Sequence, residues 1–225
     1  DSIGNTGTLG AGSVQWMTAG SGILHQEMPK GNAQGQMHGF QLWGNLPAAQ
    51  KMTAPRYQDV GSNEIPQVID DDGTRVKVIV GSFWGKTGPV DGIAADPQYL
   101  DIFVPAGVRK TFKIDTYRRA FAYVFEGAAV FADASDPTGI LLEKDVAGQE
   151  LNIRDLSGNR TLVRFGTGDE VTLQAGPEGV RFLLISGAPI SEPVAWYGPI
   201  VMNTRAELQQ AMRDLNNGTF IRPAH

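Results

Sequence analysis

A tight-turn motif occurs twice in this 225-residue chain, and the repeat limits what the chain can fold into. Residues 9–13 read LGAGS, and 156 positions later residues 165–169 read FGTGD. Ala19-Gly20 is matched by Ala175-Gly176 at the same offset, and after a one-residue insertion Ile23–Glu27 aligns with Val180–Leu184. A G-x-G turn, a strand, an Ala-Gly bend and a second strand form a hairpin pattern. Two copies predict two similar β-barrels rather than one large sheet.

The rest of the sequence is typical of short strands joined by turns. The chain contains 28 glycines and 13 prolines, and turn signals such as Asp71-Asp72-Gly73 and Glu126-Gly127 separate apolar runs. The runs with strand character are Val76–Val80, Leu100–Val104, Ala120–Phe125, Thr161–Phe165 and Phe182–Ile185. One helix is predicted near the C-terminus. Thr204 and Glu207 form a capping-box pattern there, and Gly218 is placed to end the helix.

The repeat also predicts that the first barrel is incomplete at its N-terminus. Strand-like sequence begins near Tyr99, 67 residues before Gly166, whereas only 9 residues precede Gly10. A barrel without its first strands would leave open sheet edges, which proteins normally avoid. We therefore expect the chain to start inside its first domain, with the other strands deleted, cleaved or supplied by another chain.

His25 and Glu27 are the strongest candidates for chemistry. On a strand, residues two apart lie on the same face, so both side chains would point into the barrel lumen. A buried imidazole and carboxylate need a metal ion or a hydrogen-bonded network. In the second copy the equivalent residues are Phe182 and Leu184, which read as core residues. Only the first barrel is therefore predicted to hold a metal.

Two ligands do not complete a metal site, because protein sites usually offer three or four. His38 is expected to be structural or exposed, and His225 is the last residue. We expect Phe40 and Trp43, like Trp16 and Met17, to fill a core. Two common motifs are missing from the sequence. It has no nucleophile elbow, which a serine hydrolase would need, and no phosphate-binding loop ending in Gly-Lys-Ser/Thr.

Charge and composition narrow the function classes further. The net charge is −5 and the basic pairs at 109–110 and 118–119 are short, so direct nucleic-acid binding is not expected. The chain has no cysteine, which excludes disulfides and thiolate sites. No apolar run approaches the roughly 20 residues that span a bilayer, and no leader opens the sequence. We expect a cytoplasmic protein that does not bind membranes.

Several long motifs resemble the pirin family. The motifs are DSIGNTG at 1–7, GSVQWMTAG at 12–20, GILHQEMP at 22–29, GFQLWGNLP at 39–47, KM at 51–52, PRYQD at 55–59 and GPIVMNT at 198–204. They occur at both ends of the chain and in the expected order, so the resemblance covers nearly all of it. It implies an all-β fold of two cupin (double-stranded β-helix or jelly-roll) barrels, the first incomplete at its N-terminus, and a C-terminal α-helix that returns towards the first barrel.

The resemblance also implies a division into domains and a metal site. Residues 1–95 would be the remainder of the metal-type cupin domain and the connection, 96–200 the cupin domain without metal ligands, and 201–225 the helix and tail. Pirins bind iron (Fe²⁺ or Fe³⁺) or another divalent metal through an H-x-H pair and an H-x-E pair. The second pair maps onto His25 and Glu27, whereas no H-x-H occurs in the 225 residues. That pair is expected upstream of Asp1, and this chain alone is expected to lack a complete site.

Two functions follow from the resemblance. One is a dioxygenase of the quercetin 2,3-dioxygenase type that acts on a flavonoid, in which Glu27 is a ligand or the base that accepts the flavonol proton. The other is a non-enzymatic, metal-dependent regulator that binds a protein partner, such as a transcription factor or a metabolic enzyme. An inert fragment is the third alternative, although an isolated piece of a barrel would be unstable.

Overall fold

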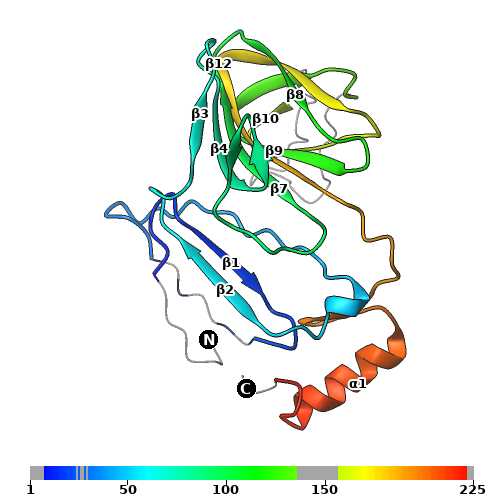
Figure 1. Cartoon of the computed structure of the whole chain (residues 1–225). Coiled ribbons are helices and arrows are strands. Elements are labelled where there is room, and N and C mark those ends of the chain that lie inside the picture. The colour runs from blue at the N-terminus through cyan, green and yellow to red at the C-terminus, as the bar shows by residue number, and fades with distance from the viewer. Residues whose placement is uncertain (1–7, 24, 26–27, 29, 136–156, 222–225) are drawn as a thin grey trace, which may run out of the picture. The chain divides into compact units, whose positions relative to one another are not determined.

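A computed structural model describes residues 8–23, 25, 28, 30–135 and 157–221 (Figure 1). The chain forms two compact units. Unit 1 combines Asp1–Ser62 with Ile190–His225, and unit 2 is the continuous segment Asn63–Pro189. The C-terminal helix therefore belongs to the same unit as the N-terminal residues, as the pirin resemblance implies. The three-part division of the sequence at residues 95 and 200 stays a prediction.

Unit 2 is a β-barrel built on one antiparallel sheet. Its strands are β3 (Gln67–Ile69), β4 (Arg75–Val80), β5 (Ser82–Phe83), β6 (Lys86–Thr87), β7 (Gln98–Val104), β8 (Arg109–Lys113), β9 (Arg119–Phe131), β10 (Ser157–Gly158), β11 (Thr161–Arg164) and β12 (Glu170–Gly187). The large sheet has the order β10-β9-β12-β7-β4-β3, with β11 paired to β9 and β8 paired to β12. Four of the five predicted runs lie within these strands and the fifth, Thr161–Phe165, extends one residue past the end of β11, so the all-β prediction is confirmed.

The lumen of unit 2 is filled with apolar side chains. Successive side chains of a strand point to opposite faces, so one set from each strand faces inward. The ring of Phe182 is fully buried and packs edge-on against Phe112 at 6.0 Å and Phe131 at 5.8 Å between ring centroids. Leu184, two residues further along the strand, is also fully buried. Phe182 and Leu184 are core residues, as the repeat predicts.

Unit 1 holds shorter elements (Figure 1). They are β1 (Val14–Thr18), the 3₁₀ turn η1 (Ala48–Gln50), β2 (Arg56–Val60), β13 (Ala195–Tyr197), β14 (Ile200–Met202) and the helix α1 (Arg205–Asn216). β1 pairs with β2 and β13 pairs with β14, both antiparallel. Of the helices in the described residues, none is long and apolar enough to cross a membrane.

The predicted helix signals are confirmed in α1. The Thr204 side chain accepts a hydrogen bond from the backbone N–H of Glu207, and the Glu207 carboxylate accepts one from the backbone N–H of Thr204. Gly218 has a φ of +71°, and its N–H donates to the carbonyl of Leu215 as the helix ends. These bonds satisfy backbone groups that every helix end leaves open.

The sequence repeat is visible in where the strands start. β1 begins at Val14 and β12 begins at Glu170, which preserves the offset of 156 residues. At the second Ala-Gly bend, the pairing of β12 with β9 shifts register between Ala175 and Val180. Gly127 on β9 lies at this bulge with a φ of +67°. The predicted turn at Glu126-Gly127 is therefore wrong, because both residues lie inside the continuous strand β9, and the extra residues of the bulge, 176–179, lie on β12.

The two copies differ after the bend. In unit 2, Val180–Ser186 pairs with β7 on one side and with β9 on the other. In unit 1, the described residues of segment 22–30 are not in a strand. A strand needs partners for its backbone groups. His25 itself is described outside any strand, and Leu24, Gln26 and Glu27 lie outside the described residues.

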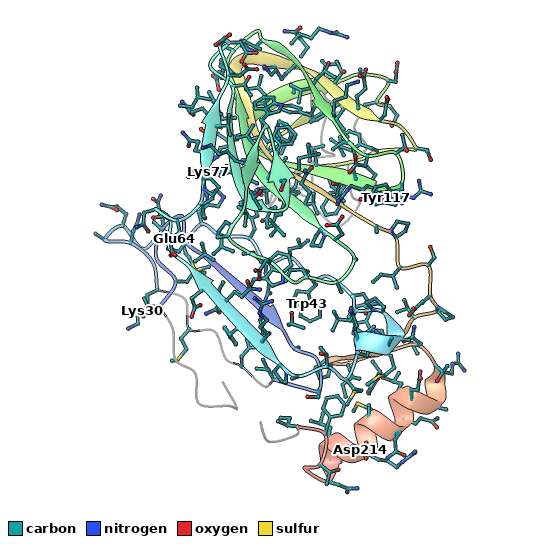
Figure 2. All side chains as sticks on the ribbon, in the orientation of Figure 1. Lys30, Trp43, Glu64, Lys77, Tyr117 and Asp214 are labelled. Carbon is teal, nitrogen blue, oxygen red and sulfur yellow. The ribbon has the colours of Figure 1, made fainter. Side chains whose placement is uncertain are left out.

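Two rings expected in a core are exposed. Trp43, labelled in Figure 2, is 68% exposed, and Phe40 is 43% exposed. Segment 38–47 contains no helix or strand, so these side chains have no regular face to bury. Trp16 and Met17 on β1 are half-buried. His38 is exposed, as predicted, and its ring lies 5.2 Å from that of Phe40.

Candidate metal centre in unit 1

The residues just before His25 are fixed by backbone contacts. The N–H of Ser21 donates to the carbonyl of Thr53 at 2.8 Å, and the N–H of Gly22 donates to the carbonyl of Ala19 at 2.9 Å. Ser21 and Ile23 are buried. His25 itself is exposed. The chain is thus tightly held up to Ile23, and the imidazole follows two residues later.

Glycine is required at two positions in the segment just before His25. A Cβ at Gly20 would stand 2.1 Å from the carbonyl oxygen of Thr53, and the φ of Gly20 is +51°. A Cβ at Gly22 would stand 3.0 Å from two ring carbons of Phe220, at a φ of +121°. The loop after η1 therefore lies against Gly20, and the tail after α1 lies against Gly22, both just before His25.

Polar contacts connect the C-terminal segment to the η1 region within unit 1. The Glu192 carboxylate accepts a hydrogen bond from the N–H of Ala48 at 2.7 Å and from Nδ2 of Asn203 at 2.8 Å. Lys51 is buried and donates to Oδ1 of Asn45 at 2.8 Å. Burial lowers the pKa of Lys51, against the opposing attraction of Glu192 and Glu207. This network holds the loop after η1, which contacts Gly20 and Ser21 through Thr53.

The sequence singled out part of this network without assigning it a role. Lys51, Asn45 and Asn203 lie inside motifs that resemble pirin, but nothing in their spacing shows that they meet. Glu192 lies outside those motifs and was missed. It lies three residues after the end of unit 2, and only the fold shows that it meets Ala48 and Asn203.

The donor set for a metal is incomplete in this chain. An imidazole and a carboxylate two residues apart suit a divalent cation. Among the described residues, however, no group of three or more His, Cys, Asp or Glu side chains could hold a metal. Of the two predicted ligands, the structure places only His25, and the assignment of His25 and Glu27 stays a prediction.

The fold and these contacts define a cupin-type β protein, and the family matches agree. Residues 99–221 match the family described as the pirin C-terminal cupin domain, and residues 1–44 match the family described as pirin. The chain belongs to the pirin family.

Three relatives illustrate the range of the similarity. A pirin-like protein of Caulobacter vibrioides is 41% identical over 98% of this chain and 72% of its own length. Pirin-1 of Arabidopsis thaliana is 38% identical over 96% of this chain and 69% of its own length. The crystal structure of quercetin 2,3-dioxygenase from Acinetobacter baumannii superposes with a TM-score of 0.73 at 30% identity, and covers 96% of this chain and 69% of that one.

Proposed function

We propose that this protein is a metal-dependent oxygenase of the quercetin 2,3-dioxygenase type, with a flavonol as its substrate class. The observation that carries the proposal is the likeness to the Acinetobacter baumannii quercetin 2,3-dioxygenase, which extends over 96% of this chain. The contrast between the two repeat copies supports the same view. The position of His25 is taken by the buried Phe182 in unit 2, so chemistry is assigned to unit 1 alone.

The proposed cofactor is iron or another divalent metal, held in part by His25 and Glu27. The 225 residues contain no H-x-H pair, and the proposal therefore needs further ligands besides these two. Such a metal would supply Lewis acidity and a template for the reactants. Glu27 is proposed as a ligand or as the base for the flavonol proton.

The test is quercetin turnover under O₂ by the protein expressed from its whole gene, followed by loss of flavonol absorbance and by O₂ uptake. His38→Ala is the matched control for His25→Ala, because both remove an exposed imidazole from unit 1. Turnover in the wild type and in His38→Ala, but not in His25→Ala, supports the proposal. Equal turnover in His25→Ala contradicts it.

A regulator that binds a protein partner is the second candidate. The observation in its favour is the apolar exposed segment 37–43, in which Met37 is 64% exposed and Trp43 is 68% exposed. Exposed apolar side chains close together in sequence are typical of interaction surfaces. Iron bound by the protein without any flavonol turnover would favour this function over the oxygenase.

A further inference from the structure

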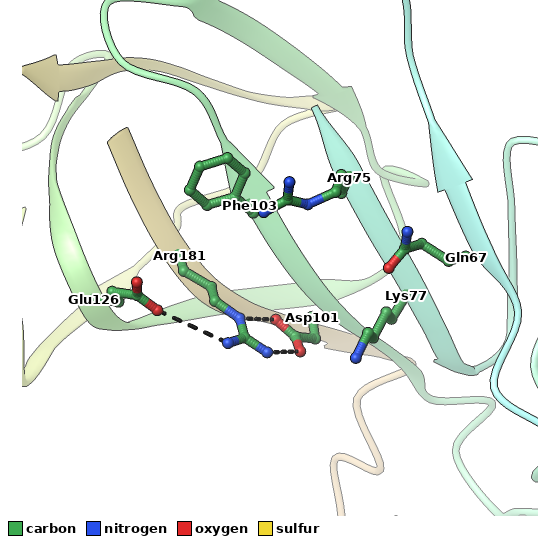
Figure 3. Close-up of a pocket in the computed structure, with 7 residues that line it drawn as sticks. All are labelled: Gln67, Arg75, Lys77, Asp101, Phe103, Glu126 and Arg181. Atoms are coloured by element: carbon green, nitrogen blue, oxygen red, sulfur yellow. Dashed lines mark hydrogen bonds and ion pairs between the residues drawn. The ribbon is translucent and has the colours of Figure 1, made fainter. Parts of the chain in front are cut away.

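An open groove of about 300 Å³ lies on the outer face of unit 2, opposite the apolar lumen (Figure 3). On β4, Val76 and Val78 are fully buried, so the alternating residues Arg75 and Lys77 point outward. The same alternation on β7 places polar and aromatic side chains on the outer face. The groove is lined by Gln67, Arg75, Lys77, Asp101, Phe103, Glu126 and Arg181.

One row of cross-strand neighbours forms the first wall of the groove. Arg75 on β4 stands opposite Phe103 on β7, which stands opposite Arg181 on β12. The guanidinium carbon of Arg75 lies 4.3 Å from the centre of the Phe103 ring. This stacking fixes the plane of the guanidinium and leaves its N–H edge available to a ligand.

The charge of the Arg181 guanidinium is balanced by two carboxylates of the protein. Its Nε and Nη2 donate to the two oxygens of Asp101 at 2.9 and 2.6 Å, and Nη1 lies 3.8 Å from Oε2 of Glu126 (Figure 3). The Asp101 side chain is only 14% exposed. The two-point geometry makes this pair a rigid part of the groove wall.

Lys77 is the third cationic side chain of the groove. It stands opposite Gln67 on β3 and opposite Asp101 on β7. Asp101 is already engaged by Arg181, and within the described part of the chain no carboxylate lies within 4.0 Å of the Lys77 ammonium. The groove thus combines three cationic side chains with two carboxylates, in a chain whose net charge is −5.

We propose that this groove binds a compact anionic group, the carboxylate or phosphate of a small molecule, through Lys77, Arg75 and the amide of Gln67. A volume of about 300 Å³ lies at the lower end of small-molecule sites. All residues of the groove belong to unit 2, whereas the metal chemistry is proposed for unit 1.

The test is titration of the protein with inorganic phosphate and with succinate at constant ionic strength, followed by calorimetry and by amide chemical shifts. We expect saturable binding of at least one probe at one site. Lys77→Gln should weaken that binding by roughly tenfold, the size expected when a charge-assisted contact is lost. Arg75→Gln provides a second variant with the same expected loss. Phosphate alone, succinate alone or both would each support an anion site and would identify its chemistry.

Lys86→Gln is the matched control, because Lys86 is an exposed lysine of the same unit and lies outside the groove. Its removal changes the net charge equally and should leave binding unchanged. Absence of saturable binding to either probe would overturn the proposal. Equal weakening by Lys77→Gln and Lys86→Gln would also overturn it, since that result indicates nonspecific attraction.

Discussion

The ring of Phe220, which follows α1, lies directly against Gly22, three residues before His25. A Cβ built at Gly22 would stand 3.0 Å from Cδ1 and Cε1 of that ring. Phe220 also packs on the small core formed by Ile200, Met202 and Ala211. The C-terminal tail therefore contacts both the core of unit 1 and the segment just before His25.

Gly22→Ala should destabilise unit 1, because the added methyl meets the Phe220 ring at a backbone conformation that favours glycine. We expect a loss of about 1–3 kcal/mol in the free energy of unfolding, measured by denaturant titration. Gly35→Ala is the matched control, since Gly35 has a φ of +73° but no atom within 4 Å of the added Cβ. A cost for Gly22→Ala no greater than that of the control would contradict the packing described here.

Phe182→Ala should be severe, because it empties the centre of the unit 2 lumen. Deleting a fully buried phenylalanine costs about 3–5 kcal/mol, through lost burial and the cavity left behind. Phe40→Ala, at a ring that is 43% exposed, should cost less than about 1 kcal/mol. Denaturant unfolding monitored by circular dichroism measures both variants, and similar losses would contradict the assignment of these rings.

The β3–β4 turn should make stability depend on acidic pH. Burial disfavours the Asp72 carboxylate, but hydrogen bonds from Lys110 at 2.6 Å and from the N–H of Thr74 at 2.9 Å outweigh it and lower its pKa to about 2. A carboxylate whose pKa is lower in the folded state stabilises the fold above its unfolded pKa of about 4. That stability is lost as pH falls towards 2.

Asp72→Asn should therefore remove part of the acid dependence, on the order of 1 kcal/mol between pH 5 and 2 once solvent screening is allowed for. The measurement is the unfolding midpoint as a function of pH. Asp71→Asn, in the same turn, is the control, because only the backbone of Asp71 bonds within it. If the unfolding midpoint of Asp72→Asn depended on pH as the wild type does, the acid dependence would not come from Asp72.

Thr204→Ala should destabilise α1 by about 1 kcal/mol, because it removes the side-chain acceptor for the N–H of Glu207. The hydrogen bond from Thr204 also lowers the pKa of Glu207. Thr204→Ser keeps the hydroxyl and should retain most of the stability. Thermal unfolding compares the two variants, and an equal loss in both would argue against the capping role.

Five strands of unit 2 could be predicted because their signals are local: β4, β7, β9, β11 and β12. Runs such as Val76–Val80 carry apolar residues at the positions that face the lumen, and the strand follows. The capping box at Thr204 is equally local. The groove could not be predicted, because Lys77, Asp101 and Arg181 become neighbours only through the strand order β12-β7-β4.

The assignment of His25 and Glu27 as metal ligands stays a prediction, and the strand expected there is not found at His25. The repeat led us to expect a strand at His25, since the equivalent Phe182 lies on one. Phe182 is in a strand because β7 and β9 flank it. Pairing partners of this kind are a property of the whole fold and cannot be read from a repeated hairpin motif. The exposure of Trp43 was missed for the same reason, because an aromatic residue in a segment without regular structure has no predictable face.

The 225-residue chain by itself should retain little metal. It supplies two predicted ligands, and three or four are usual for a protein site. After dialysis against a weak chelator, we expect less than about a tenth of an equivalent of iron per chain by elemental analysis. Retention near one equivalent would mean that other residues complete the site.

The most direct test of the assignment of metal chemistry to unit 1 is the iron content of the protein expressed from its whole gene, compared in the wild type, His25→Ala and His38→Ala. We predict about one equivalent in the wild type and in His38→Ala, and less than about a tenth in His25→Ala. Iron retained at the wild-type level in His25→Ala would contradict the account.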